Sequence, residues 1–416
     1  MACCAYAMTI FSYIQGIFAI QKHAFMPLQY IIWDINPILT QIGAFSVRWY
    51  GLLFALGFVL GRQLWHSFLK QEGKHLQDLD TFVLHIMLGT IIGARLGHVL
   101  FYDFSYFLQH PLEIFLPCQL SPTFKFTGYS GLASHGAAIG ILTSIYIYAN
   151  YVITIRLLPP RLMIKKQRRV GQSYLWIADR LMIVVALAGF FIRIGNFMNS
   201  EVIGKPTQHQ HGVVFARSIT DVDQLPAVKN AIDSIQIQKG DTQLPCGSQY
   251  QPVILTIRFK HYGFSEIVIR NFIEYNIKRA CMQNARIAEH IYEPQDAPLQ
   301  YKLSKSRQGA YLARVTTLGI PRHPAQLYEA FSCLILFLFL FHQWKNKKAL
   351  LRPGLLFGVF LTAVFSLRIV YEFFKESNVV CDTILGPLRM PQLLSFPLVI
   401  AGITLLVYSS NKKYTA

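Results

Sequence analysis

The residues best suited to chemistry are four polar side chains at the end of a long apolar run. The stretch Gly189–Gly204 reads GFFIRIGNFMNSEVIG and contains Arg193, Asn196, Asn199 and Glu201. On a helix the first two of these share a face. Polar groups at membrane depth are costly, so they usually face a partner, a water-filled cavity or a substrate. The alternative is a helix that ends at the membrane interface with a snorkelling arginine and polar capping residues.

The composition is that of a polytopic membrane protein. Of 416 residues, 53% are hydrophobic and 14% are charged, whereas an ordinary soluble domain has about 25% charged residues. The net charge of +18 would suit nucleic acid. However, the basic residues form short clusters between apolar runs, as cytoplasmic loops do, so we expect no nucleic-acid partner. The seven cysteines form no CxxC pair and no metal-like spacing, so no metal site is predicted.

The elements that must position the polar residues are seven apolar runs of membrane-spanning length. The predicted fold is therefore an α-helical polytopic membrane protein with about seven transmembrane helices. The basic loops 154–174 and 344–353 mark the cytoplasmic side, which places the N-terminus outside and the C-terminus in the cytoplasm. The expected helices are 48–68, 80–102, 131–153, 175–197, 324–343, 354–374 and 391–409.

The segment between the fourth and fifth runs has a different composition. It mixes charges of both signs and contains the alternating stretch QPVILTIRF, which predicts an extracytoplasmic α+β insertion. Its Cys246 and Cys281 are candidates for a disulfide. Met26 is a second plausible start of the chain, besides Met1. The expected division is 1–47 as leader and outer segment, 48–204 as helices 1–4, 205–323 as the insertion, and 324–416 as helices 5–7 with a cytoplasmic tail.

The polar residues of different helices reach a similar depth. Counted from the cytoplasmic face, Arg95, Arg193 and Arg368 lie after about 22, 27 and 21 Å. His135 lies about 6 Å from the outer face. All fall in the outer half of a core about 30 Å thick. Three arginines at one level indicate a polar chamber for an anionic ligand, most simply a phosphate.

Structural alternatives remain open for several of these residues. Arg95 could pair with Glu372 or Glu201, since intramembrane ions usually pair. His135 lies among small residues that allow close helix packing, and the same small residues leave room for a lipid. His323 and Tyr328 could be interfacial anchors.

Several motifs in one order carry a resemblance to a known family. They are RWYG from Arg48, GARLGHVLFY from Gly93, SHGAAIG from Ser134, RIGNFMNSEVIG from Arg193, PRHPAQLYEA from Pro321, RIVYEFFKE from Arg368 and MPQLLSFP from Met390. The chain thereby resembles the prolipoprotein diacylglyceryl transferases. The resemblance implies transfer of diacylglycerol from phosphatidylglycerol to the thiol of a prolipoprotein signal-peptide cysteine, in the bacterial inner membrane. No metal or organic cofactor is expected.

Three features depart from the family pattern. Ile192 stands where the family usually has glycine, and Val364 stands where many members have tyrosine. No role for that tyrosine can be carried over. The segment 205–323 is longer than in many relatives.

Chemistry assigns roles to these residues. The thiolate is the reactive form of cysteine, and His135 is the natural base to generate it. Arg193, helped by Asn196, is expected to hold the phosphate, and Arg368 is a second phosphate ligand or an activator of the thiol. Glu201 and Glu372 are expected to hold arginines in place. The remaining residues expected to bind substrate are Tyr50, Arg95, Asn199, Gly204, His323, Gln326, Tyr328 and Glu329.

A second function, of a different class, is a transporter or binding protein for an anionic solute. In that case the arginine-lined chamber would be a pathway. The sequence shows no internal repeat, which weakens the inverted-repeat transporter hypothesis.

Overall fold

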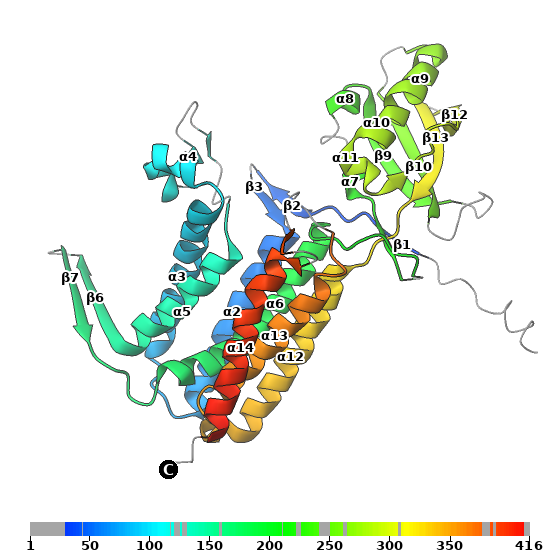
Figure 1. The fold of residues 1–416 in the computed structure, drawn as a ribbon. Coiled ribbons are helices and arrows are strands. Elements are labelled where there is room, and N and C mark those ends of the chain that lie inside the picture. Colours follow the sequence, from blue (N-terminus) through cyan, green and yellow to red (C-terminus); the bar gives the residue numbers. More distant parts are fainter. Residues whose placement is uncertain are drawn as a thin grey trace, which may run out of the picture. The chain divides into compact units, whose positions relative to one another are not determined.

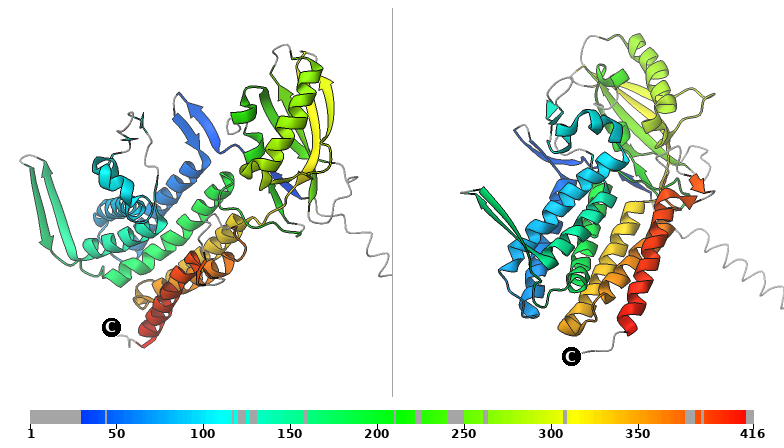
Figure 2. Two further views of the ribbon diagram at one scale, coloured as in Figure 1. Left: turned by 45° about the horizontal axis from the view of Figure 1, so that its top comes forward. Right: turned by 60° about the vertical axis from the view of Figure 1, so that its left-hand side comes forward.

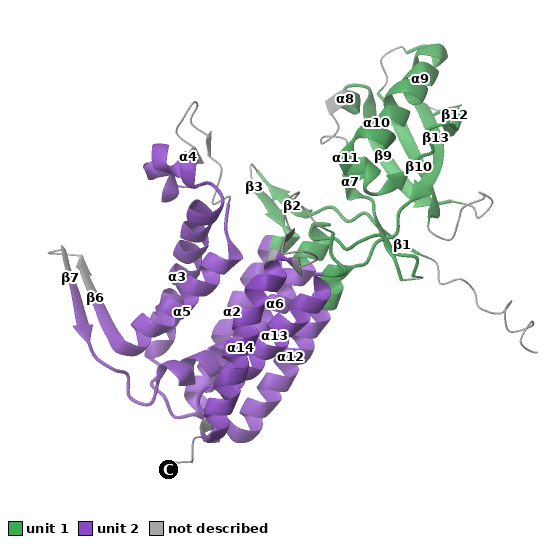
Figure 3. Ribbon diagram, in the orientation of Figure 1, with its two compact units in different colours: residues 1–50, 195–328, 373–380 green, residues 51–194, 329–372, 381–416 purple. Residues whose placement is uncertain are grey.

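The computed structural model describes most of the chain. The described residues are 30–43, 45–116, 118–119, 125–126, 131–157, 160–209, 211–221, 226–240, 250–260, 264–306, 309–376, 383–385 and 388–411. The alternative starts Met1 and Met26, and Cys246, lie outside them. The chain divides into two compact units, each made of several segments (Figure 3). Unit 1 contains residues 1–50, 195–328 and 373–380, and unit 2 contains 51–194, 329–372 and 381–416.

Unit 2 is a helical bundle (Figure 1). A helix occupies each of the seven predicted apolar runs, and among the described residues five are long and apolar enough to cross a membrane. The five are α2 (Trp49–Gln71), α3 (Asp78–Phe101), α6 (Tyr174–Met198), α12 (Ala325–Lys347) and α14 (Met390–Asn411). Two shorter helices occupy the other runs, α5 (Ser134–Asn150) and the apolar α13 (Leu355–Tyr371). The short helices are α4 (Phe104–Gln109), η1 (Pro111–Ile114) and η4 (Lys348–Leu350).

The predicted span 131–153 and the observed helix differ at the C-terminal end. The run 131–153 was expected to be helical throughout, but α5 ends at Asn150 and a hairpin follows. Its strands are β6 (Tyr151–Leu157) and β7 (Pro160–Lys166), paired antiparallel. The β-branched alternation in YVITIRL favours a strand over a helix. Part of the expected cytoplasmic loop 154–174 is therefore a β-hairpin.

The helices of unit 2 pack through large apolar side chains and through close glycine contacts. Trp65, Phe68 and Trp344 are at most 1% exposed within one core cluster. Helices α3 and α5 lie side by side in both views of Figure 2. Their contact needs glycine, because a Cβ on Gly93 would lie only 2.8 Å from the Cα of Gly140. This close approach holds α5 against α3.

Unit 1 contains a five-stranded antiparallel sheet covered by helices. The stretch QPVILTIRF is the central strand β10, and its side chains alternate in burial as the sequence predicted. The strand order is β11-β13-β10-β9, and β12 also pairs with β13. The strands are β9 (Ile232–Lys239), β10 (Gln251–Phe259), β11 (Ile291–Tyr292), β12 (Gln300–Lys305) and β13 (Tyr311–Gly319). The helices are α7 (Arg217–Thr220), α8 (Pro226–Lys229), α9 (Glu266–Phe272), η3 (Ile273–Ile277), α10 (Lys278–Gln283) and α11 (Ala285–Ala288).

The core of this sheet is formed by apolar side chains from strands and helices together. Leu255 and Val315 of the sheet pack with Ile273 and Cys281 of the helices, and all are at most 4% exposed. Cys281 is a free, buried thiol whose pKa burial raises to about 12.

The described residues also form four further two-stranded sheets. Strand β1 (Ile31–Trp33) pairs in parallel with β8 (Val213–Phe215). The ring of Trp33 lies 4.1 Å from that of Phe197, centroid to centroid, and both residues belong to unit 1. The antiparallel pairs are β2 (Ile38–Ile42) with β3 (Phe45–Arg48), β4 (Cys118–Gln119) with β5 (Lys125–Phe126), and β14 (Thr383–Leu385) with β15 (Leu388–Arg389).

Candidate functional site

Three helices of unit 2 bring two arginines and a glutamate together. The Nε atom of Arg193 on α6 lies 2.5 Å from a carboxylate oxygen of Glu329 on α12. On α13, the guanidinium of Arg368 lies within the electrostatic field of both residues. We call Arg193, Arg368 and Glu329 the arginine cluster. Two guanidinium groups face one carboxylate here, so the cluster carries a formal excess of positive charge, which suits an anionic ligand.

His135 lies near this cluster, in the first turn of α5. The charge of Arg368 acts on its imidazole. The adjacent Gly136 is buried against Gly97 of α3, whereas the side chain of His135 is exposed. Of the two alternatives for His135, helix packing is thus carried by the neighbouring glycines. The imidazole itself is accessible from outside the helix pair.

Arg95 contacts backbone rather than carboxylates in its described hydrogen bonds. Its guanidinium donates to the carbonyl oxygens of Glu113 (2.6 Å), Ile114 (3.0 Å) and Gly131 (3.5 Å). The Cζ atom also lies 4.8 Å from the centre of the Phe107 ring. Arg95 therefore fastens the segment after α3 and the residue that leads into α5. A carboxylate partner or a substrate contact was expected for Arg95.

Glu372 has an arginine partner that the sequence argument did not single out. At the C-terminal end of α13, its carboxylate lies 3.6 Å from Arg389, which also donates to the Glu372 carbonyl at 3.2 Å. The Glu372 charge acts on Arg368 as well. Glu372 thus contacts one arginine and influences the charge state of a second.

Glu201 lies in unit 1, in a loop that follows α6. Its carboxylate accepts hydrogen bonds from the Nδ2 atoms of Asn199 (3.2 Å) and Asn196 (3.4 Å). Gln326 donates to its backbone carbonyl at 2.5 Å. Its described partners are therefore amides, although an arginine partner was expected. A carboxylate only accepts hydrogen bonds, so Glu201 orients the side-chain amides of Asn196 and Asn199 with their nitrogens toward its oxygens.

The backbone of this loop is strained on both sides of Glu201. Ser200 and Val202 have φ values of 54° and 56°, in the left-handed region. For Val202, which is β-branched, a positive φ is a genuine outlier. Such strain costs about 1–3 kcal/mol and persists where surrounding contacts enforce it, commonly at functional sites.

The residues around Gly204 leave no room for a side chain. A Cβ atom there would lie 2.5 Å from the carbonyl oxygen of His323. Buried Arg322 donates to the Gly204 carbonyl at 3.2 Å and to the Glu289 carbonyl at 2.8 Å, and it forms an ion pair with Glu376. Arg322 and Glu376 were not among the expected site residues, although both stand inside quoted motifs.

Three further expected residues of unit 1 have defined contacts. The Nδ1 atom of His323 lies 3.2 Å from the Tyr328 hydroxyl. Burial, with a contribution from His209, lowers the pKa of His323. The ring of Tyr50 packs against Gly195, where a Cβ atom would lie 2.8 Å from Tyr50 Cδ2.

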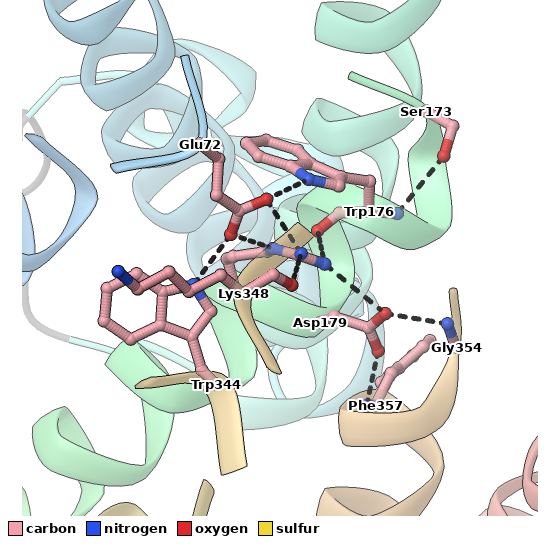
Figure 4. A network of polar contacts seen from close by, with 9 residues as sticks. Glu72, Ser173, Trp176, Asp179, Trp344, Lys348, Gly354 and Phe357 are labelled. Atoms are coloured by element: carbon pink, nitrogen blue, oxygen red, sulfur yellow. Dashed lines mark hydrogen bonds and ion pairs between the residues drawn. The ribbon is translucent and has the colours of Figure 1, made fainter. Parts of the chain in front are cut away.

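A second set of ionic residues was not among the expected site residues. In unit 2, Glu72, Asp179 and Arg180 have fully buried side chains joined by ion pairs (Figure 4). Asp179 and Arg180 stand next to each other inside the predicted span 175–197. Two charges within an apolar run were a signal that sequence reasoning could have used. Among the described residues, no group of three or more His, Cys, Asp or Glu side chains could hold a metal ion.

The chain is similar to a known family over most of its length. A family model described as prolipoprotein diacylglyceryl transferase matches residues 37–408. A phosphatidylglycerol–prolipoprotein diacylglyceryl transferase from Tolumonas auensis is 32% identical, covering 92% of this chain and 99% of the relative. Proteins of the same name from Chloroherpeton thalassium and Bacteroides fragilis are 30% and 29% identical, each covering 92% of this chain and 96% of the relative.

Proposed function

The chain belongs to the prolipoprotein diacylglyceryl transferase family, and we propose that it catalyses the reaction that this name describes. It transfers the diacylglyceryl group of phosphatidylglycerol to the thiol of a signal-peptide cysteine in prolipoproteins. A carbon–sulfur bond forms, the carbon–oxygen bond to the phosphate breaks, and glycerol phosphate leaves. This is the first step of lipoprotein maturation. The observation that carries the proposal is the family match over residues 37–408.

The protein is a multi-pass membrane protein, and we place it in the bacterial inner membrane. The five long apolar helices support this, and we propose that α5 and α13 also cross, which makes seven spans. The N-terminus would lie outside and the C-terminus in the cytoplasm, as the basic loops indicate. The α+β segment 205–323 would then be extracytoplasmic, between the helical segments 48–204 and 324–416, with 1–47 before them.

The arginine cluster is the proposed phosphate site. Arginine presents planar, bidentate donors and stays charged in an apolar setting. Arg193 is assigned to the phosphate of phosphatidylglycerol, with Asn196 three positions further along α6. Arg368 is the second cation. As the carbon–oxygen bond breaks, negative charge grows on the departing phosphate, and fixed guanidinium groups stabilise it without reorganisation.

His135 is the proposed base for the thiol. Its imidazole is exposed on α5 and lies within the field of Arg368. A neutral imidazole accepts the thiol proton, and the resulting thiolate attacks the saturated carbon on the side opposite the phosphate. The nearby guanidinium favours the thiolate further. Arg368 therefore acts both on the leaving group and on the environment of the nucleophile.

The other expected residues support these groups. Glu329 and Glu372 hold arginines, and Glu201 orients the amides of Asn196 and Asn199. The residues that complete the proposed substrate-binding set are Tyr50, Arg95, Gly204, His323, Gln326 and Tyr328. The comparisons do not favour the transporter alternative.

A transfer assay tests the function directly. The purified full-length protein is mixed with phosphatidylglycerol and a synthetic signal peptide with one cysteine, and the peptide is analysed by mass spectrometry. We expect the mass of one diacylglyceryl group on the cysteine. The same peptide with serine in place of cysteine should remain unmodified. A cysteine peptide that also gains no mass would contradict the proposal.

Thiol labelling in intact cells tests the topology. Val170 (93% exposed) and Ile267 (72% exposed) are suitable sites for an introduced cysteine. We expect an impermeant maleimide to label Ile267→Cys and to spare Val170→Cys until the cells are opened. The parent protein measures labelling of native cysteines. The reverse pattern would overturn the proposed orientation.

A further inference from the structure

The buried ionic network of Glu72, Asp179 and Arg180 contributes no group to the proposed chemistry. Arg180 donates to both carboxylate oxygens of Glu72, at 3.0 and 2.9 Å. The indole nitrogens of Trp176 and Trp344 donate to the same carboxylate, at 2.8 and 2.7 Å. The network therefore joins the C-terminal end of α12, which contains Trp344, to α6.

Asp179 joins α13 to the same network. One carboxylate oxygen accepts from the backbone N–H of Gly354 at 2.7 Å, and the other accepts from Phe357 at 2.9 Å. Gly354 is the N-cap of α13 and has no side chain to cap its own helix. A helix N-terminus needs such acceptors, and an aspartate is among the best. Here a neighbouring helix supplies the cap (Figure 4).

The spacing along the two helices is equal. Arg193 follows Asp179 by 14 positions on α6, and Arg368 follows Gly354 by 14 positions on α13. Fourteen residues of helix span about 21 Å. Asp179 contacts Gly354 at one end, and the charge of Arg193 acts on Arg368 further along, so both helices run in the same direction from the buried network to the arginine cluster.

Helix α12 has a similar spacing between its two polar contacts and runs in the opposite direction. On α12, Glu329 precedes Trp344 by 15 positions. Glu329 contacts Arg193, and Trp344 contacts Glu72. Two polar levels, about 21 Å apart, therefore tie α6, α12 and α13 together. Movement of α13 by one residue would shift Arg368 by about 1.5 Å along the axis and turn it by about 100°.

We propose that the buried network sets the axial register of these helices, and that Asp179 is a positioning residue for Arg368 relative to Arg193. The inference rests on the proposed function, in which both arginines hold one phosphate. A misplacement of about 1 Å at a reacting centre can cost about 10²-fold in rate. Asp179 thus acts on the reaction from the other end of the bundle.

The first test compares Asp179→Ala with two controls on the same unit. Leu181→Ala removes a buried apolar side chain of α6, and Asp80→Ala removes an exposed carboxylate. We expect Asp179→Ala to lower kcat/KM about 10²-fold. This loss should be far larger than that of Leu181→Ala when each variant is assayed at the same interval below its own melting temperature. Asp80→Ala should resemble wild type. Asp179→Asn keeps one acceptor oxygen and should recover part of the activity. Equal losses in Asp179→Ala and Leu181→Ala would overturn the proposal.

A double-mutant cycle separates positioning from general destabilisation. Arg193→Lys is combined with Asp179→Asn, which retains a capping group and so favours folding. If Asp179 aligns the two arginines, the combined loss should be smaller than the product of the single losses. Losses that multiply would contradict the proposal.

A cross-linking test needs no activity. A Cβ atom on Gly189 of α6 would lie 3.7 Å from the Cβ of Cys333 on α12, a distance typical of disulfides. We expect Gly189→Cys to cross-link to Cys333 under mild oxidation, and Glu72→Gln to slow it. An unchanged cross-linking rate would overturn the role of the network. If the wild-type protein transfers no lipid, the proposed function fails, and the cross-linking result still decides whether the network holds α6 and α12 in register.

Discussion

Two arginines on helix α6, thirteen positions apart, have opposite surroundings. Arg180 has a side chain that is 0% exposed, and its donors bind Glu72 and the Lys348 carbonyl. Arg193 is 25% exposed and contacts Glu329, whose charge also acts on Arg368. The first arginine lies in a closed network, and the second lies in a cluster with more positive than negative charge.

The difference teaches how one helix serves both stability and function. A buried ion pair leaves an uncompensated charge when one partner is removed, which is strongly destabilising. A partly exposed guanidinium with a second cation beside it gains from an added anion instead. We therefore expect substitutions at Arg180 to act mainly on folding, and substitutions at Arg193 to act mainly on catalysis.

The largest expected effect is at Arg193. Arg193→Ala should lower transfer by about 10³-fold or more, the size of effect seen when an arginine that stabilises growing charge on phosphate oxygens is lost. Arg193→Lys should also be poor, because lysine has no planar fork of donors. The measurement is kcat/KM for phosphatidylglycerol, with Arg62→Ala, which breaks an exposed ion pair, as control. Near-normal activity of the lysine variant would show that charge alone suffices.

The second prediction concerns His135 and the thiol. His135→Gln should lower the rate by about 10²–10⁴-fold, the usual contribution of a general base. The loss should shrink between about pH 7 and pH 9, because more of the substrate thiol is already ionised. The measurement is the ratio of wild-type to variant rates across that window. A ratio independent of pH would remove the base assignment and leave Arg368 as the activator of the thiol.

The third prediction breaks the closed network. Arg180→Met leaves Glu72 buried without its cation and should lower the free energy of unfolding by about 3–5 kcal/mol. Arg193→Met is the matched control on the same helix and should cost clearly less stability, because Arg193 is partly exposed. Thermal unfolding in detergent measures both. Equal destabilisation by the two variants would show that the comparison is wrong.

The last prediction extends the comparison to a third arginine and concerns stability in acid rather than at neutral pH. Arg322 is 2% exposed. Burial of His290, with a contribution from the charge of Arg322, lowers the pKa of His290 to about 3. In the unfolded chain the pKa is about 6.5. The unfolded state therefore binds more protons between these values, so His290 favours folding fully above about pH 6.5 and loses this contribution as the pH falls toward 3.

The test is the pH dependence of unfolding. His290→Gln should flatten the decline of stability between about pH 6.5 and pH 3, whereas His211→Gln, at an exposed position, should leave it unchanged. An identical decline in wild type and His290→Gln would mean that His290 protonates freely in the folded protein.

The expectations from sequence were strongest where local pattern dominates. The seven apolar runs predicted the helices because side-chain hydrophobicity along a single segment is sufficient. The alternation in QPVILTIRF indicated an α+β segment, and this stretch forms β10. The apolar run 131–153 extends past the end of α5 at Asn150, because a β-branched stretch continues the run as a strand. Arg193 and Arg368 could be singled out because charge is rare in such runs.

Pairing was decided by tertiary structure. Glu201 was expected to hold an arginine, but its described partners are amides, and Arg193 contacts Glu329 instead. Asp179 looked like part of a helix, and only packing shows that it caps another one. Composition along the chain determines which segments avoid water and which charges they contain. Which charges meet depends on the register between helices, and that is set by contacts between residues far apart in sequence.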